Sequence, residues 1–236
     1  FIASHDGIGI RPTEGIFSKK LFNNFLLRLK KNGSKFSYRK INSKKKKVYE
    51  ANITVFDALK KSNSDLNGKF AFDRYISAHS IMIAFEGVPA IYFNSLFGTS
   101  NDESKFVITG NNRDINRYRW SEKNLISYLQ NKKSKQNIFY ESITNLINIK
   151  SKQSAFHPNA NRSYIYLGSK IFAFKRTSTD KKQTILCLTN LTSKVQYPRL
   201  DQKYHLWKNL INFKTKIKKN DPFKLEPFET MWLSNI

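Results

Sequence analysis

The chain begins with FIASHDGIGIRPTEGI, residues 1–16, and this stretch decides the fold that the sequence predicts. A short apolar run, Phe1 to Ser4, leads directly into His5, Asp6 and Gly7, a pattern typical of a buried strand that ends in a polar loop. Open and closed parallel sheets place their functional groups beyond the carboxyl ends of the strands. The stretch therefore predicts an α/β fold with a site close to residues 5 and 6.

Helix-like and strand-like segments alternate through the first part of the chain. Apolar residues recur at helical spacing over 16–29, after Pro12 and Glu14 in an expected first turn, and Asn32-Gly33 ends the pattern. The remaining pattern predicts a helix over 70–85, a buried strand over 88–94, and helices over 121–129 and 136–149. A helix that leads into a buried strand is an α/β signal.

The second part of the chain reads as short strands separated by turn signals. The strand-like stretches are SYIYLGS, KIFAFKRTS, QTILCLTNLT, YHLWKNLI and FKLEPFETMWLSNI. They predict a small antiparallel sandwich that follows a linker at residues 153–161. We therefore expect two domains, residues 1–152 and residues 153–236.

The charge raises the question of an anionic partner, because 42 Lys and Arg against 17 Asp and Glu give a net charge of +25. The basic residues are spread along the whole chain and accompany heavy use of Asn and Ile, a skew typical of an A+T-rich genome. The one dense run, 43–47, is expected to be a solvated loop. We therefore expect no nucleic-acid partner.

Cysteine and hydropathy patterns indicate where the protein works. Cys187 is the only cysteine, so the chain has no internal disulfide, and its apolar setting predicts a buried strand thiol. No apolar stretch approaches the roughly 20 residues that cross a bilayer. These features predict a cytoplasmic protein without membrane contact, and the absence of His-rich or Cys-rich spacing predicts no metal site.

Several stretches together resemble a known family of enzymes. They are FIASHDGIGIRPTEGI, RYISAHSIMIAFEGVPAIYFNSLFGTSND, GNNRDINRYRW, QSAFHPNA and LEPFETMWLSN. In this order they resemble the C-terminal half of the sucrose-phosphorylase-like glycoside phosphorylases of the α-amylase superfamily. The resemblance implies the C-terminal portion of a TIM (β/α)8 barrel over residues 1–152, followed by a small antiparallel β-sandwich domain over residues 153–236.

The resemblance also implies a role for the opening motif. FIASHDG matches the family's His-Asp motif at the end of the seventh barrel strand, and VPAIYFNSLFG matches the eighth strand with its outgoing loop. Asp6 then corresponds to the third catalytic carboxylate, which holds sugar hydroxyls and stabilises the transition state. His5 corresponds to a residue that binds the same glucosyl unit. Such a carboxylate accelerates the reaction if its hydrogen bonds strengthen as the sugar ring distorts.

A phosphorylase also requires cationic donors where phosphate attacks, and guanidinium groups suit this task. The resemblance places an arginine of the loop NNRDINRYRW in the acceptor or phosphate subsite. Arg113 and Arg117 are therefore the expected substrate-binding residues, with Arg119 as a third possibility. Asp102, in the stretch GTSND, is expected either to contact the acceptor or to form a turn.

Two catalytic groups of the family have no counterpart in this sequence. The resemblance places the nucleophilic Asp and the acid/base Glu on barrel strands four and five, upstream of Phe1. We therefore expect the chain to be a fragment of a retaining α-glucoside phosphorylase and to be inactive alone. The complete enzyme is expected to use inorganic phosphate as co-substrate, to need no other cofactor and to release α-glucose 1-phosphate.

Two further interpretations stay open. The first is a hydrolase or transglucosidase of the same superfamily. The second is a non-catalytic carbohydrate-binding or nucleic-acid-binding module that uses aromatic residues such as Tyr164, Tyr166, Phe172 and Phe174, although sandwich packing also explains these residues. The acceptor is open among fructose, fructose phosphate, glycerate and glycerol, with a lean towards glucosylglycerate or glucosylglycerol, and so is the oligomeric state.

Overall fold

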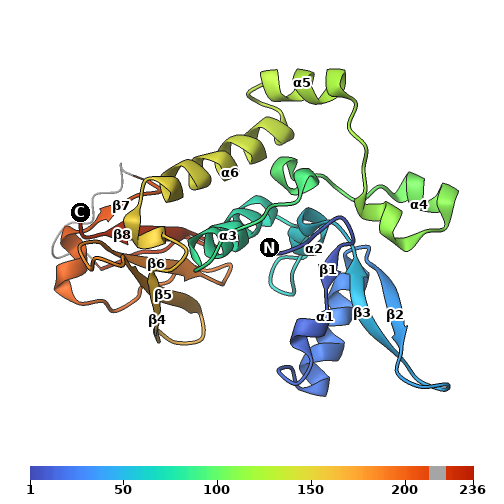
Figure 1. Cartoon of the computed structure of the whole chain (residues 1–236), viewed down its shortest axis with the longest axis horizontal. Coiled ribbons are helices and arrows are strands. Elements are labelled where there is room, and N and C mark those ends of the chain that lie inside the picture. Colours follow the sequence, from blue (N-terminus) through green and yellow to red (C-terminus); the bar gives the residue numbers. More distant parts are fainter. Residues whose placement is uncertain (213–221) are drawn as a thin grey trace. The chain divides into compact units, whose positions relative to one another are not determined.

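The computed structural model describes residues 1–212 and 222–236, which form two compact units. The first unit contains Phe1–Ala71 and Ala90–Glu141, and the second contains Phe72–Pro89 and Ser142–Ile236. Figure 1 labels the helices and strands of both units. The expected domain boundary between residues 152 and 153 stays a prediction.

The first unit is built on a three-stranded antiparallel sheet with the order β1-β3-β2. Its strands are β1 (Ile8–Gly9), β2 (Lys35–Lys40) and β3 (Lys46–Asn52). Helix α1 (Lys19–Lys31) lies beside this sheet (Figure 1). Its apolar side chains join a core made of Ile10, Leu29, Val48, Ala51, Ile53 and Ala58. This core holds Ile8 to Ile10 against β3.

The Lys-rich run 43–47 forms the exposed tip of a β-hairpin, as expected of a solvated loop, although β3 already begins at Lys46. The helical start expected at Pro12 is wrong. The helix begins at Lys19 because the Ser18 hydroxyl caps it and accepts the Leu21 N–H at 3.3 Å. Pro12 lies instead in a separate 3₁₀ turn.

The strand expected over 88–94 does not form either. Residues 88–92 have no strand assignment, and a 3₁₀ helix, Phe93–Phe97, follows them. The opening residues Phe1 to Ser4 likewise make only an isolated bridge, between Ser4 and Gly7. An apolar run becomes a strand only where a neighbouring strand takes up its backbone hydrogen bonds, and none of the described strands does so here.

The remaining regular elements of the first unit are helices joined by loops. Helix α2 (Val55–Lys60) follows β3, and α4 (Glu103–Thr109), a 3₁₀ helix (Asn112–Asn116), α5 (Glu122–Gln130) and the start of α6 (Lys135–Ser151) come later. The helices expected over 121–129 and 136–149 are thus confirmed. None of the helices in the described ranges is long and apolar enough to cross a membrane.

The second unit holds a five-stranded antiparallel sheet with the order β4-β5-β6-β8-β7. Its strands are β4 (Asn161–Ile165), β5 (Ile171–Thr177), β6 (Thr184–Asn190), β7 (Lys208–Asn209) and β8 (Thr230–Ser234). The expected antiparallel strands are therefore confirmed, except that much of YHLWKNLI is a 3₁₀ turn, Gln202–Leu206. The described residues of this unit form a single sheet, so a sandwich of two sheets stays a prediction.

Helix α3 (Ala71–Ala84) confirms the helix expected over 70–85. His79 of this helix is a core residue, since it is 1% exposed and its Nδ1 lies 2.9 Å from the Tyr75 carbonyl oxygen. Burial lowers the pKa of His79 to about 4. Cys187 is also buried, as expected, and burial raises the pKa of its thiol.

A buried arginine ties the end of α3 to the sheet of the second unit. Arg176 of β5 is fully buried, and its Nη1 donates to the Ala84 carbonyl at 2.6 Å. Its Nη2 donates to the carbonyls of His157 and Ala160 at 2.7 and 3.2 Å. One guanidinium therefore binds three carbonyl groups at a helix end and in a turn, where backbone acceptors often lack regular partners.

Candidate functional site

Asp6 lies in a tight turn that is pressed against β3. Ser4 and Gly7 exchange two backbone hydrogen bonds of 3.0 and 3.1 Å, and the Ser4 hydroxyl accepts the Asp6 N–H at 3.1 Å. Gly7 has a φ of +107°, and a Cβ atom at this position would collide with the Ala51 carbonyl oxygen of β3. Only glycine fits these two conditions, so Gly7 fixes where the Asp6 carboxylate points.

The substitution Gly7→Ala is expected to lower the free energy of unfolding by about 3 kcal/mol, because it adds a steric collision to an unfavourable φ. Urea unfolding measures the loss. Gly15→Ala is the matched control, since Gly15 also has a positive φ, +78°, but has open space around its Cβ position. Equal losses of unfolding free energy for Gly7→Ala and Gly15→Ala would show that the collision with β3 adds nothing to the cost of the substitution.

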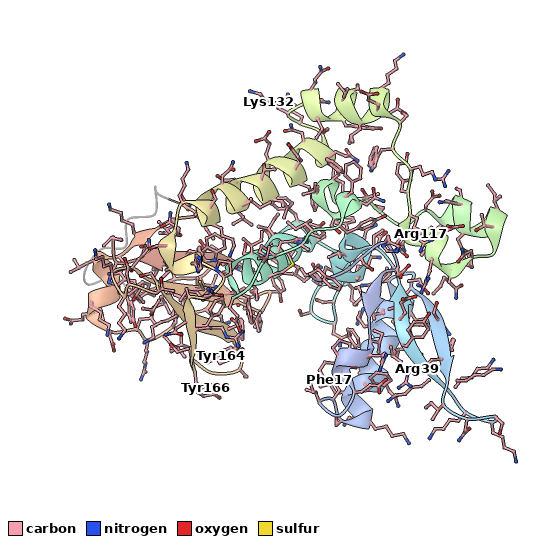
Figure 2. All side chains as sticks on the ribbon, viewed as in Figure 1. Phe17, Arg39, Arg117, Lys132, Tyr164 and Tyr166 are labelled. Carbon is pink, nitrogen blue, oxygen red and sulfur yellow. The ribbon has the colours of Figure 1, made fainter. Side chains whose placement is uncertain are left out.

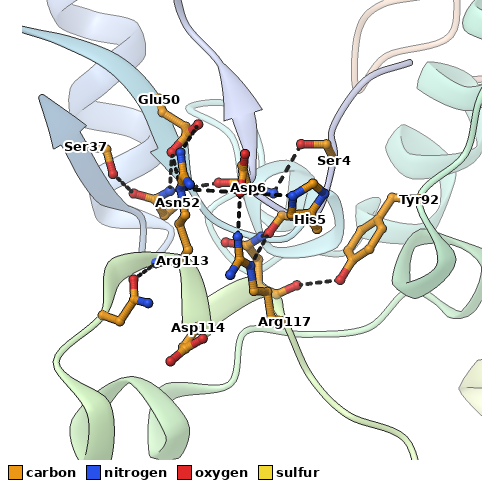
Figure 3. Close-up of polar contacts among 12 residues, drawn as sticks. Ser4, His5, Asp6, Ser37, Glu50, Asn52, Tyr92, Arg113, Asp114 and Arg117 are labelled. Carbon is orange, nitrogen blue, oxygen red and sulfur yellow. Dashed lines mark hydrogen bonds and ion pairs between the residues drawn. The ribbon is translucent and has the colours of Figure 1, made fainter. Parts of the chain in front are cut away.

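The Asp6 carboxylate is bound asymmetrically (Figure 3). Its Oδ1 lies 2.6 Å from Arg117 Nη2, 3.3 Å from Arg113 Nε and 3.3 Å from His5 Nε2. Its Oδ2 accepts no hydrogen bond from the described residues. The side chain is 26% exposed, so solvent reaches part of it.

The loop that carries the arginines is fastened to the backbone at His5. Asn111 caps the 3₁₀ helix Asn112–Asn116, and its Oδ1 accepts the Arg113 N–H at 3.1 Å. The His5 carbonyl oxygen accepts hydrogen bonds from Asn116 Nδ2 and, at 3.1 Å, from Arg117 Nε. Residues more than 100 positions apart in the sequence therefore form one site.

Glu50 on β3 holds Arg113 in place. The guanidinium donates from Nε to Glu50 Oε2 at 3.0 Å and from Nη2 to Oε1 at 3.3 Å, a bidentate pair. This pairing raises the pKa of Arg113 above its ordinary value. Glu50 is 8% exposed, so Arg113 compensates a buried charge and is held rigidly beside Asp6.

Asn52 connects Glu50 to the turn at Asp6. Its Nδ2 donates to the Asp6 carbonyl at 2.8 Å and to Glu50 Oε2 at 3.1 Å, while its Oδ1 accepts the Ser37 hydroxyl at 2.8 Å. The sequence interpretation named neither Glu50 nor Asn52 as a site residue. Their spacing of two in the apolar stretch VYEANITVF is the signal that was available, because alternate strand residues share a face.

The other two expected residues lie elsewhere. Asp102 caps α4: its Oδ1 accepts the Lys105 N–H at 2.9 Å, and its own N–H donates to the Ile115 carbonyl at 2.7 Å. Arg119 is exposed and does not contact Asp6. The structure therefore brings together Asp6, His5, Arg113 and Arg117, and an acceptor contact for Asp102 stays a prediction.

The fold is an α/β fold similar to that of a glycoside phosphorylase of known structure. The crystal structure of sucrose 6F-phosphate phosphorylase from Thermoanaerobacter thermosaccharolyticum matches 79% of this chain and 35% of that chain, with a TM-score of 0.63 and 21% sequence identity. No protein-family model matches the sequence.

Sequence relatives give the closer relationship. Glucosylglycerate phosphorylase of Escherichia coli is 29% identical over 236 residues, which are 99% of this chain and 40% of that protein. Glucosylglycerate phosphorylase of Spirochaeta thermophila is 30% identical over 192 residues, or 81% of this chain and 32% of that protein. The chain is a homologue of these glycoside phosphorylases and spans about a third to two fifths of their length. The resemblance stated from the sequence is confirmed.

Proposed function

We propose that this chain is part of a retaining α-glucoside phosphorylase and supplies its sugar-binding carboxylate and its phosphate-binding loop. The observation that carries the proposal is the binding of two guanidinium groups at Asp6 Oδ1 while Oδ2 accepts no hydrogen bond from the described residues. The phosphorylase names of the relatives support it. The nucleophile and the acid/base would then belong to segments outside these residues, as would the remainder of a (β/α)8 barrel.

Asp6 would act on the glucosyl unit. In a retaining transfer the sugar passes through an oxocarbenium-like state with positive charge at the ring. A carboxylate that accepts ring hydroxyls at Oδ2 binds this state more tightly than the relaxed sugar, which is the condition for a faster chemical step. The arginines at Oδ1 hold the Asp6 carboxylate in its orientation. His5, whose Nε2 lies 3.3 Å from the same carboxylate, would bind the same glucosyl unit.

Arg117 is the better candidate for phosphate. Two of its nitrogens, Nε and Nη2, bind the His5 carbonyl and Asp6, whereas Nη1 has no partner among the described residues. Arg113 is committed to Glu50 and also donates from Nη2 to the Tyr49 hydroxyl at 3.3 Å. Arg113 would therefore position Asp6, and Arg117 would present free N–H donors to the attacking phosphate.

The proposal includes several features that follow from a phosphorylase. The substrates would be a small α-glucoside and inorganic phosphate, with no metal or further cofactor, and the products would include α-glucose 1-phosphate. The chain alone would be inactive, because Asp6 without a nucleophile and an acid cannot break a glycosidic bond. A cytoplasmic location and a C-terminal β-sandwich are part of the same proposal.

A chimera tests the proposal. The 236 residues replace the matching segment of Escherichia coli glucosylglycerate phosphorylase, and the chimera is incubated with glucosylglycerate with and without phosphate. We expect α-glucose 1-phosphate only when phosphate is present, and no product from the chain alone. Phosphate-independent release of glucose would instead support the hydrolase interpretation. Addition of the remaining segment of the relative as a separate polypeptide provides a second version if the chimera folds poorly.

A further inference from the structure

A groove of about 600 Å³ lies on the second unit. The turn between β4 and β5 forms one wall, including Tyr166, Ser169 and Lys170, and the segment after β6 forms the other, including Tyr197 and Arg199. Small-ligand pockets typically measure about 300–1,000 Å³. The groove therefore has the size of a site for a small molecule.

The tyrosines of the groove are unusually exposed for aromatic residues. Tyr166 is 88% exposed and Tyr197 is 59% exposed, and neither makes a ring contact or a side-chain hydrogen bond within the described ranges. Figure 2 shows Tyr166 projecting from the end of β4. Tyr164 differs, because the Arg162 guanidinium lies 4.6 Å from its ring centroid and Phe172 lies 6.0 Å away. Packing thus explains Tyr164, whereas Tyr166 and Tyr197 present open ring faces.

The charges of the groove have one sign. Lys170 and Arg199 are exposed and form no ion pair with any described residue, and no carboxylate lines the groove. The wall that carries Arg199 is fixed, because Gln196 and Leu225 exchange backbone hydrogen bonds of 3.0 and 2.9 Å. An unpaired guanidinium on a fixed wall is suited to a phosphate group.

We propose that this groove binds a phosphorylated monosaccharide. The apolar faces of the sugar ring pack against Tyr166 and Tyr197, and the phosphate pairs with Arg199 and Lys170. Tyrosine suits a sugar because it combines a large apolar face with a hydroxyl that can meet the ring's polar edge. A nucleic-acid strand instead needs a longer row of cations and stacking platforms, and this groove offers two of each.

Titration of the whole chain with α-glucose 1-phosphate, followed by amide NMR, tests the proposal. We expect the signals of residues 166–171, 196, 197 and 199 to shift, and glucose or inorganic phosphate alone to bind about tenfold more weakly. The double variant Tyr166→Ala/Tyr197→Ala, and separately Arg199→Ala, should each weaken binding about tenfold. Tyr38→Ala and Arg11→Ala are the matched controls, since both residues are exposed and belong to the first unit.

The same titration separates this groove from the site at Asp6. In Arg117→Ala the groove signals should still shift, even if any binding near residue 6 is lost. Absence of shifts at residues 166–171, 196, 197 and 199, or shifts that persist unchanged in the tyrosine double variant, would overturn the proposal. Tighter binding of a thymidine oligonucleotide at the same signals would overturn it as well.

Discussion

Asp6→Asn is expected to lower kcat/KM of the chimera by about 10³-fold, with most of the loss in kcat. Asparagine keeps the shape of the side chain but removes the negative charge, so neither the ion pair with Arg117 nor the charge facing the oxocarbenium-like sugar remains. Initial rates of α-glucose 1-phosphate formation over a range of substrate concentrations separate kcat from KM.

The control for this prediction is Asp201→Asn. Asp201 is a 72% exposed carboxylate that pairs only with Lys203 among the described residues, and its replacement should leave the rate unchanged. A loss of less than tenfold for Asp6→Asn, or a change confined to KM, would mean that Asp6 binds substrate without stabilising the transition state.

Arg176→Ala is expected to lower the free energy of unfolding of the second unit by about 3 to 5 kcal/mol. The substitution removes the side-chain donor from the carbonyls of Ala84, His157 and Ala160, of which His157 keeps the Ala160 N–H at 2.9 Å. It also leaves a cavity where the side chain was fully buried. Urea unfolding followed by tryptophan fluorescence measures the effect, since Trp232 lies in the core of this unit.

A neighbour on the same strand provides the comparison for Arg176. Lys175 is partly exposed and has no hydrogen bond or ion pair through its side chain in the described part of the chain, so Lys175→Ala should change the stability by no more than about 0.5 kcal/mol. Arg176→Lys keeps the charge but reaches fewer carbonyls. Its loss of unfolding free energy should therefore lie between the losses for Lys175→Ala and Arg176→Ala. A loss below about 1 kcal/mol for Arg176→Ala would show that the carbonyls find other partners.

Local signals in the sequence predicted most of the elements. The helices over 71–84, 122–130 and 135–151 follow from apolar spacing, and the strands of the second unit follow from alternation and turn residues. The strand expected over 88–94 failed because an apolar run cannot reveal whether a neighbouring strand is present to bond with it. The hairpin at 35–52 was missed because lysines hid the strand pattern.

The site was only partly accessible from sequence. Motif resemblance singled out Asp6, Arg113 and Arg117, and the structure brings their side chains together. The motif resemblance does not reveal Glu50, because a bidentate pair between residues 63 positions apart has no local signature in the sequence. Asp102 shows the opposite difficulty, since one carboxylate next to a helix start fits both a cap and a ligand.

The attachment of the loop 111–117 to the opening turn does not depend on which side chain stands at position 5. Asn116 and Arg117 grip the backbone carbonyl of residue 5, and a carbonyl is present whatever amino acid stands there. The His5 side chain, 63% exposed, takes no part in that grip. A substitution at position 5 therefore removes the imidazole beside Asp6 Oδ1 but leaves in place the backbone acceptor that anchors the loop.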